Sequence, residues 1–222
     1  MKLASFFSGG KDSTFAIQYA LNQGWEIVCL LTVVAKIYSS HWHFINNEWI
    51  DLQAKAMEIP LVKVHEYVEI ESYRNTLIKL KEIYGIDGLL SGVIYSDYQR
   101  DYLTKMCSKI GLKLFTPLWM KNPLKLMEKM ISCGIRSIIV LVAAQGLNEN
   151  WLGTEIDYEV LNELVKLNKK YKISICGEGG EYETFVYDAP FFKKKIKIGD
   201  TSIEWMRDHG LLKIKSARLL AK

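Results

Sequence analysis

Short apolar runs alternate with segments of helical periodicity along the first half of this 222-residue chain. Continuous apolar runs of strand length are typical of strands buried on both faces. Strands that alternate with helices pair in parallel and carry helices on both faces of the sheet. The sequence therefore predicts a doubly wound α/β fold with a mostly parallel sheet. The expected strands are Lys2–Phe7, Trp25–Val34, Leu61–Val68, Gly88–Ile94 and Lys113–Pro117, and the expected helices are Ser13–Gln23, Glu48–Met57, Glu71–Tyr84 and Asp97–Ile110.

The pattern becomes less regular after Pro123. We expect helices at Leu124–Cys133 and Asp157–Lys169, a strand at Ile138–Val142, and β structure in the tail with a turn at Asp208-His209-Gly210. This mixture predicts a smaller α+β domain. We expect the chain to divide into two domains, residues 1–122 and residues 123–222.

Composition indicates a soluble protein with a real core, because 49% of the residues are hydrophobic and 24% are charged. The net charge of +4 is too small to argue for nucleic-acid binding by itself. The apolar stretch Val28–Val34 is too short to cross a bilayer, and we expect a cytoplasmic protein without membrane contact. The four cysteines have no metal-ligand spacing, which favours buried reduced thiols over reactive ones.

Three polar or irregular loops follow expected strands. They are Ser8–Ser13, Val34–Asn46 and Ser91–Arg100. In an open parallel sheet the ligand crevice lies at the carboxyl ends of the strands. We therefore expect these loops to converge in space.

The first of these loops, Ser8-Gly9-Gly10-Lys11-Asp12-Ser13, joins a strand to a helix. Glycines let the backbone approach an anion, the helix amino terminus offers N–H groups, and Lys11 adds a charge. A phosphate-binding turn is one interpretation, and an ordinary turn in which Asp12 or Ser13 caps the helix is the other. The spacing fits neither the Walker loop, which needs Ser or Thr after the lysine, nor the G-x-G-x-x-G fingerprint.

The loop resembles the SGGxDS signature of the PP-loop ATP pyrophosphatases. This resemblance implies a Rossmann-like sheet of the adenine-nucleotide α hydrolase type, with ATP bound by residues 1–122 and cleaved between the α- and β-phosphates. It assigns ATP binding to Ser8, Gly9, Gly10, Lys11, Asp12, Ser13 and Gly92. We expect Lys11 to face solvent at the strand end and to neutralise charge on the pyrophosphate. Asp12 is expected to help hold Mg²⁺, and Gly92 to permit close approach of the nucleotide.

The nucleophile that finishes the reaction distinguishes members of that superfamily. This chain shows no glutaminase module and no paired cysteines for sulfur transfer, which leaves free ammonia or an amine carried by the substrate. Three further segments resemble the diphthine–ammonia ligases: residues 89–119, residues 177–190 with "GEGGEYETFVYDAP", and residues 52–61 with "LQAKAMEIPL". His43 and Asn46 also stand where that family has a His-Thr-Pro-Asn stretch, with Phe44 and Ile45 in place of its middle pair.

The second resemblance implies ATP-dependent amidation of the diphthine carboxylate on translation elongation factor 2 of archaea or eukaryotes, with ammonium as the nitrogen source. We expect an archaeal source for the chain. Glu178, Glu181 and Glu183 are candidates to bind ammonium or the substrate's trimethylammonium group and to accept a proton. Glu181 and Glu183 would share one face of an extended strand, and Tyr182, Phe185 and Tyr187 offer aromatic faces to the cation. The substrate-binding candidates in residues 123–222 and in the crevice are His43, Asn46, Tyr95, Gln99, Arg100, Gly179, Gly180 and Tyr182.

Simpler interpretations stand beside these. The glutamate-rich segment could be an exposed acidic turn, Asp97 could be a helix cap, and His43 could be packed or exposed. Tyr95 and Trp42 suit a core or a pocket wall. Lys193, Lys194, Lys195 and Lys197 suit a solvated strand edge better than a dock for an acidic protein. A ligase for an RNA base and a non-catalytic nucleotide sensor are the alternative functions, and the sequence leaves open a homodimer and a separate glutaminase.

Overall fold

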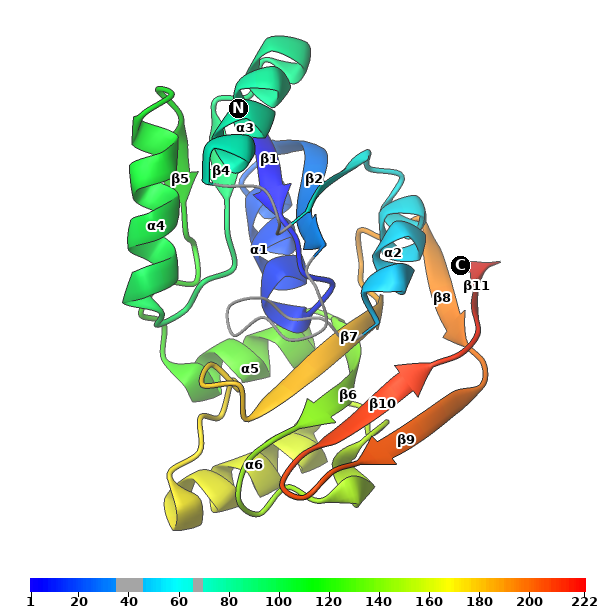
Figure 1. Cartoon of the computed structure of the whole chain (residues 1–222). Coiled ribbons are helices and arrows are strands. Elements are labelled where there is room, and N and C mark those ends of the chain that lie inside the picture. Colours follow the sequence, from blue (N-terminus) through cyan, green and yellow to red (C-terminus); the bar gives the residue numbers. More distant parts are fainter. Residues whose placement is uncertain (35–45, 66–69) are drawn as a thin grey trace.

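A computed structural model describes residues 1–34, 46–65 and 70–222 of the chain (Figure 1). Its first half forms a five-stranded sheet in the order β3-β2-β1-β4-β5, and all neighbouring strands are parallel. The reversal of strand order between β1 and β4 marks the position where ligands bind in sheets of this kind. The strands are β1 (Lys2–Phe6), β2 (Glu26–Val34), β3 (Leu61–His65), β4 (Gly88–Leu90) and β5 (Lys113–Phe115).

Helices cover both faces of this sheet, as the alternation of apolar runs predicts. On one face Leu3 and Leu30 pack with the first two helices, and on the other face Ala4 and Leu31 pack with the next two. Successive strand residues point to opposite faces, which explains why apolar residues fill both cores. The helices are α1 (Lys11–Asn22), α2 (Ile50–Met57), α3 (Ile70–Tyr84) and α4 (Asp97–Ser108), and the 3₁₀ turn η1 (Asn47–Trp49) precedes α2.

The second half forms a smaller α+β region, also as expected. An antiparallel sheet has the order β7-β6-β10-β9, and β8 pairs with β11 in a separate ribbon. The turn expected at Asp208-His209-Gly210 joins β9 to β10. The elements are α5 (Pro123–Ser132), β6 (Arg136–Val142), η2 (Glu149–Trp151), α6 (Tyr158–Tyr171), β7 (Tyr182–Asp188), β8 (Lys194–Ile198), β9 (Thr201–Trp205), β10 (Gly210–Ile214) and β11 (Ala217–Ala221).

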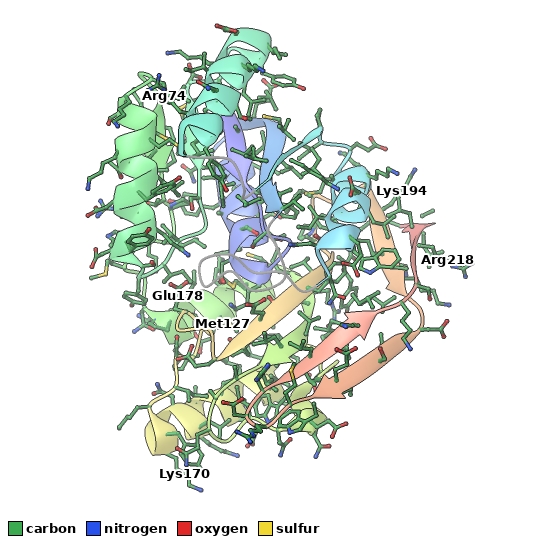
Figure 2. The ribbon with its side chains drawn as sticks, in the orientation of Figure 1. Arg74, Met127, Lys170, Glu178, Lys194 and Arg218 are labelled. Atoms are coloured by element: carbon green, nitrogen blue, oxygen red, sulfur yellow. The ribbon has the colours of Figure 1, made fainter. Side chains whose placement is uncertain are left out.

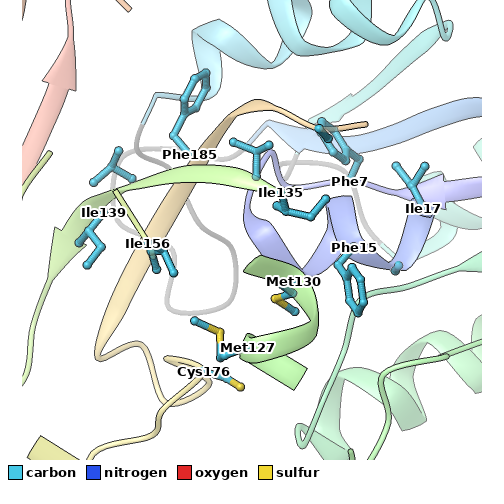
Figure 3. Packing of buried hydrophobic residues seen from close by; sticks show 14 of the residues in the cluster. Phe7, Phe15, Ile17, Met127, Met130, Ile135, Ile139, Ile156, Cys176 and Phe185 are labelled. Carbon is cyan, nitrogen blue, oxygen red and sulfur yellow. The ribbon is translucent and has the colours of Figure 1, made fainter. Parts of the chain in front are cut away.

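The two halves share one hydrophobic core. Phe7 and Phe15 from the parallel-sheet half belong to the same buried cluster as Met130, Ile135 and Phe185 from the second half (Figure 3). The strand β7 lies against α1 in Figure 1 and contacts it. The loop at the amino end of α1 is therefore covered by residues that come more than 160 positions later in the chain.

Candidate active site

The loop Ser8–Ser13 connects β1 to α1 at the switch point between β1 and β4. Gly10 is the N-cap residue of α1 and has no side chain of its own to cap the helix, while the Lys11 N–H of the first turn donates to Thr184 Oγ1. The alternative in which Asp12 or Ser13 is the cap therefore does not hold. The first-turn N–H groups of a helix lack intrahelical partners and carry partial positive charge. A helix start behind a glycine turn, with no side chain on its N-cap residue, is suited to an anion.

Gln53 of α2 and residues of strand β7 hold this loop in place through hydrogen bonds. The Gln53 side chain is fully buried, and its Nε2 donates to the Gly9 carbonyl at 2.8 Å and to the Val186 carbonyl at 2.7 Å. The Val186 N–H also donates to the Gly9 carbonyl, and the Lys11 N–H donates to Thr184 Oγ1 at 3.0 Å. These bonds fix the loop backbone before any ligand arrives. Gln53 lies in the segment "LQAKAMEIPL", and a polar residue on the buried face of a helix is the signal that could have singled it out.

Two glycines of the site are required by geometry. Gly9 has a φ of +80°, and a Cβ there would lie 2.5 Å from Gln53 Oε1. A Cβ at Gly92 would lie 2.7 Å from the Asp12 carbonyl and from the Ser13 nitrogen. Gly92 thus lets the loop after β4 pack on the start of α1. Gly92 also lines the cleft, and its close approach to a nucleotide stays a prediction.

Lys11 is buried, with 4% of its surface exposed, which corrects the expectation of a solvent-facing lysine. Its Nζ donates to the Cys176 carbonyl at 2.6 Å and to Asp12 Oδ2 at 2.9 Å, and lies 5.2 Å from the centre of the Tyr182 ring. Burial by itself lowers the pKa of Lys11, but the Asp12 carboxylate and smaller contributions from Tyr182 and Cys176 raise that pKa above its usual range. The charged Lys11 side chain therefore links the loop Ser8–Ser13 to the Cys176 carbonyl, and we call this link the Lys11 tether.

A cleft opens above this loop. Ser8, Asp12, Gln99 and Glu178 line both parts of this cleft, so the two parts adjoin each other. The carboxyl-end loops of β1 and β4 and the loop before β7 meet there, and the expected convergence is observed for Ser8–Ser13 and for the residues from Ser91 to Gln99 that line the cleft. The other described lining residues are Phe6, Gly10, Lys11, Ser13, Ser91, Gly92, Val93, Ser96, Leu103, Gly177, Glu183 and Thr184.

Asp12 lines this cleft, and only one of its two carboxylate oxygens has a hydrogen-bond partner among the described residues. Oδ2 accepts from Lys11 Nζ, whereas Oδ1 is buried and has no hydrogen-bond partner among the described residues. A buried acceptor without a donor is costly unless a cation or a donor meets it. Hard cations such as Mg²⁺ prefer carboxylate oxygens. The residues present therefore fit a metal ion at Asp12, in the first turn of α1.

The three glutamates of the second half have different surroundings. Glu178 accepts from the Tyr95 N–H at 3.2 Å and lines the cleft, and Glu183 of β7 lines it too. Figure 2 shows Glu178 in the loop before β7, near Met127 of α5. Glu181 instead accepts from the N–H groups of Ser174 at 2.7 Å and Gly179 at 2.8 Å, one on each oxygen. Glu181 precedes β7 and ties its own loop together, so the expected pairing of Glu181 with Glu183 on one strand face does not occur.

Several predicted substrate contacts lie elsewhere. Tyr182 is only 2% exposed and donates its hydroxyl to the Ile175 carbonyl at 2.6 Å, and Phe185 is buried in the core. These two rings cannot meet a substrate cation, and the cation over Tyr182 is Lys11. Asn46 is buried and bonds the Leu212 carbonyl and the Ile214 N–H of β10, away from the cleft.

The remaining candidates are nearer the surface. Arg100 stacks on Trp119, with its guanidinium 4.6 Å from the ring centre, and does not line the cleft, whereas Gln99 does. Gly179 and Gly180 form the turn before β7 without lining the cleft. Ser96, not Asp97, caps α4. Lys193, Lys194, Lys195 and Lys197 are exposed on and beside β8, in agreement with a solvated strand. His43 and Trp42 lie outside the described residues.

None of the four cysteines is among the described residues that line the cleft. Cys29, Cys107 and Cys176 are buried and Cys133 is partly buried, all four as free thiols. Burial raises the pKa of Cys176 to about 12, although Lys11 nearby acts in the opposite direction. Within residues 1–34, 46–65 and 70–222, no cluster of three or more His, Cys, Asp or Glu side chains could hold a metal ion. None of the helices in those ranges has the length and apolar character needed to cross a bilayer.

Comparison with protein families identifies this arrangement. A model of the diphthamide synthase N-terminal domain matches residues 1–114, and a model of the diphthamide synthase C-terminal domain matches residues 122–220. The chain belongs to the diphthamide synthase family. The two matches cover Ser8–Ser13, Gln53, and the segment with Glu178 and Glu183.

Curated relatives of this diphthamide synthase family member carry the name diphthine–ammonia ligase. The protein from Bos taurus is 34% identical over 227 residues, which cover 91% of this chain and 85% of that protein. The protein from Danio rerio is 36% identical over 224 residues, covering 90% of this chain and 88% of that protein. The Saccharomyces cerevisiae relative is 31% identical over 231 residues, which cover 87% of this chain and 34% of its own length. These relatives are eukaryotic, so they give no support to the expected archaeal source.

A comparison with solved structures finds a predicted subunit of tRNA methyltransferase from Methanocaldococcus jannaschii. It is 16% identical, covers 85% of this chain and 99% of its own, and has a TM-score of 0.41. At that level of similarity nothing about the site follows from it. The strand order and the loop geometry are observed in this chain's own structure.

Proposed function

We propose that this chain is an ATP-dependent amide ligase that converts the carboxylate of diphthine on translation elongation factor 2 into an amide, with ammonium as the nitrogen source. The observation that carries the proposal is one cleft in which the start of α1, suited to phosphate, faces two glutamates. Phosphate and a cationic nitrogen donor need opposite charges, and this cleft is lined both by the start of α1 and by the carboxylates Glu178 and Glu183. Family membership and the curated relatives' name support the same reaction.

The chemistry needs two steps. A carboxylate is a poor electrophile, so its oxygen first attacks the α-phosphorus of ATP, and the α–β anhydride bond breaks to release pyrophosphate. Ammonia then forms a C–N bond at the acyl carbon, the bond from that carbon to the AMP oxygen breaks, and AMP leaves. The attacking nitrogen must lose a proton, which a nearby carboxylate can accept.

The described residues suggest a role for each wall. The backbone from Gly9 to Ser13 would hold the phosphates, with the Ser8 and Ser13 hydroxyls beside it. Glu183 and Glu178 would bind ammonium and take its proton. Lys11 would keep the chain at residue 176 against the loop Ser8–Ser13, so that Glu178 stays at a fixed distance from the phosphates. Gln53 would hold Gly9 in place through its hydrogen bond to the Gly9 carbonyl. Residues 1–122 would bind ATP and residues 123–222 would contribute most of the second substrate's site.

Asp12 would hold Mg²⁺, through the oxygen Oδ1 that has no partner among the described residues. When bound there, the ion would screen negative charge on the phosphates. Asp12 would at the same time keep its other oxygen on Lys11. The Asp12 carboxylate would thereby contact the ion at the phosphate site through one oxygen and the Lys11 ammonium group through the other.

The products of ATP cleavage test the proposal. Incubating the protein with ATP, ammonium and diphthine-bearing elongation factor 2 should yield AMP, pyrophosphate and the mass change from carboxylate to amide. Ammonium should support the reaction, and glutamine alone should not, because the site proposed here has no element that releases ammonia from glutamine. Stoichiometric ADP and orthophosphate, or robust use of glutamine by the purified chain, would contradict the proposal.

The glutamates give a second test with a matched pair. Glu183→Gln should lower amide formation at least a hundredfold and leave ATP affinity and stability near wild type, because Glu183 faces the cleft. Glu181→Gln should instead lower the free energy of unfolding by about 1–2 kcal/mol, because a charged acceptor for two N–H groups is replaced by an amide. Amidation rates, calorimetry with ATP and urea unfolding measure the three quantities. If Glu181→Gln loses activity at full stability, this division of roles is wrong.

Two other functions are less well supported. A ligase for an RNA base would want a basic groove, and the cleft walls carry Glu178 and Glu183 instead. A non-catalytic sensor would have no need for those carboxylates opposite a phosphate site. Neither alternative agrees with the match of both diphthamide synthase domains.

A further inference from the structure

An apolar pocket of about 380 Å³ lies between α1 and α5, outside the proposed catalytic cleft. Phe15, Tyr19, Leu118 and Leu126 form much of its wall. Three lysines also line it, and none of its described lining residues is acidic. These lysines are Lys121, Lys125 and Lys129, all exposed.

Tyr95 connects this pocket to the catalytic cleft. Its hydroxyl donates to the Lys121 carbonyl at 2.8 Å, while its backbone N–H donates to Glu178 Oε2 at 3.2 Å. Lys121 lines the pocket and Glu178 lines the cleft. The pocket, Tyr95 and the cleft mouth therefore form one continuous surface.

Large apolar side chains are exposed along this surface. Tyr95 is 39% exposed, Tyr98 is 66% exposed and Met120 is 63% exposed. Met120 has a φ of +55°, a region that residues with a side chain rarely adopt. A strained residue that presents an apolar side chain to water contributes little to folding, and such features cluster where a protein binds something.

We propose that this face, made of Tyr95, Tyr98, Met120 and the lysine-lined pocket, docks the protein substrate through an apolar segment flanked by carboxylates. The inference rests on the proposed function, since that reaction requires a side chain of a folded protein to enter the cleft. Stable protein interfaces bury about 800 Å² on each partner, far more than one modified side chain supplies. The docking face is the apolar surface continuous with the cleft, and its lysines favour an acidic partner.

A charge reversal tests the proposal. Lys125→Glu/Lys129→Glu should lower kcat/KM for the protein substrate at least tenfold and leave ATP affinity unchanged. Its matched control is Lys194→Glu/Lys195→Glu, which makes the same charge change on β8. Lys194 lies far from Glu178 in Figure 2. The control should keep wild-type kcat/KM.

An apolar variant tests the same face independently. Met120→Gly removes the exposed side chain and relieves the positive φ, so it should fold at least as well as wild type and still lose about tenfold in kcat/KM. Steady-state kinetics with diphthine-bearing elongation factor 2, calorimetry with ATP, and sedimentation of the free protein give the readouts.

The outcomes separate this inference from the proposed function. A wild-type chain that forms no amide overturns the proposed function and the docking site together. An active wild type with docking variants within twofold of its kcat/KM overturns the docking site alone, as does a control that loses as much as the test variant. A wild-type dimer that Met120→Gly or the charge reversal dissociates would assign the face to a second copy of this chain instead.

Discussion

Lys11→Met should produce a protein that is less stable and at least a hundredfold slower in amide formation. Methionine is unbranched and matches lysine as far as Cε, so the change removes little more than the charged ammonium group. It leaves the Cys176 carbonyl without its 2.6 Å donor and Asp12 without its ion pair, next to the buried Tyr182 ring. Removing one partner of a buried pair typically costs about 3–5 kcal/mol, and Asp12 is partly exposed, so we expect about 2–3 kcal/mol.

The loss of activity has a separate cause from the loss of stability. Lys11 joins the loop Ser8–Ser13 to the chain at residue 176, and Glu178 follows two residues later. Without the tether, Glu178 and the phosphate site should no longer keep their spacing. Small displacements of reacting groups cost about a hundredfold in rate.

Urea unfolding and the amidation assay, both at a temperature where the variant is folded, measure the two effects. Lys55→Met is the matched control, because Lys55 is an exposed lysine of α2. It should change stability by less than about 0.5 kcal/mol. A Lys11→Met protein with wild-type stability and turnover would show that the buried contacts of Lys11 matter to neither.

The burial of Lys11 marks the limit of prediction from the sequence. The motif Ser8–Ser13 and its place between a strand and a helix predict the loop, its position at the sheet edge and its suitability for phosphate. These depend on local periodicity and on the carboxyl-end rule for parallel sheets. The groups that cover Lys11 are Cys176 and Tyr182, more than 160 residues later, and no local pattern predicts that contact.

The same reason explains the differences among the glutamates. The spacing of Glu181 and Glu183 predicts a shared strand face only if the strand begins before Glu181. It begins at Tyr182, because Glu181 forms hydrogen bonds with the backbone of its own loop. Tyr182 was expected at the substrate for its aromatic face, and its neighbour is indeed a cation, but that cation is Lys11. The residue types indicated that Glu181 would accept hydrogen bonds and that Tyr182 would lie beside a cation. The tertiary contacts place those partners within the protein itself.

Gln53 shows how a missed residue could be found. It is a polar residue among the apolar ones that form the buried face of α2. A buried amide needs partners, and the partners here are one carbonyl from each half of the chain, Gly9 and Val186. The sequence can indicate that such a residue has a polar contact inside the protein. It cannot say that the contact joins the loop Ser8–Ser13 to β7.

Asp12→Asn should lower turnover at least a hundredfold and weaken the binding of a divalent cation to the ATP complex. The asparagine is nearly isosteric, so the fold should be kept, but the oxygen Oδ1 loses its charge or is replaced by an amide nitrogen. Single electrostatic contacts of this kind are worth about a hundred- to a thousandfold in rate. The change also removes the largest influence that raises the pKa of Lys11, so burial should then lower that pKa.

The metal readout makes this prediction specific. Titration of Mn²⁺ into the protein with ATP, followed by electron paramagnetic resonance, measures cation binding without requiring turnover. Asp97→Asn is the control, because Asp97 occupies the first turn of α4 as Asp12 occupies that of α1, yet it is exposed and does not line the cleft. It should keep wild-type cation affinity and a turnover within twofold. If Asp12→Asn binds Mn²⁺ as tightly as wild type and only turnover falls, then the ion is held by the phosphates alone. The Oδ1 atom of Asp12 would in that case serve the nucleophile's side of the cleft instead.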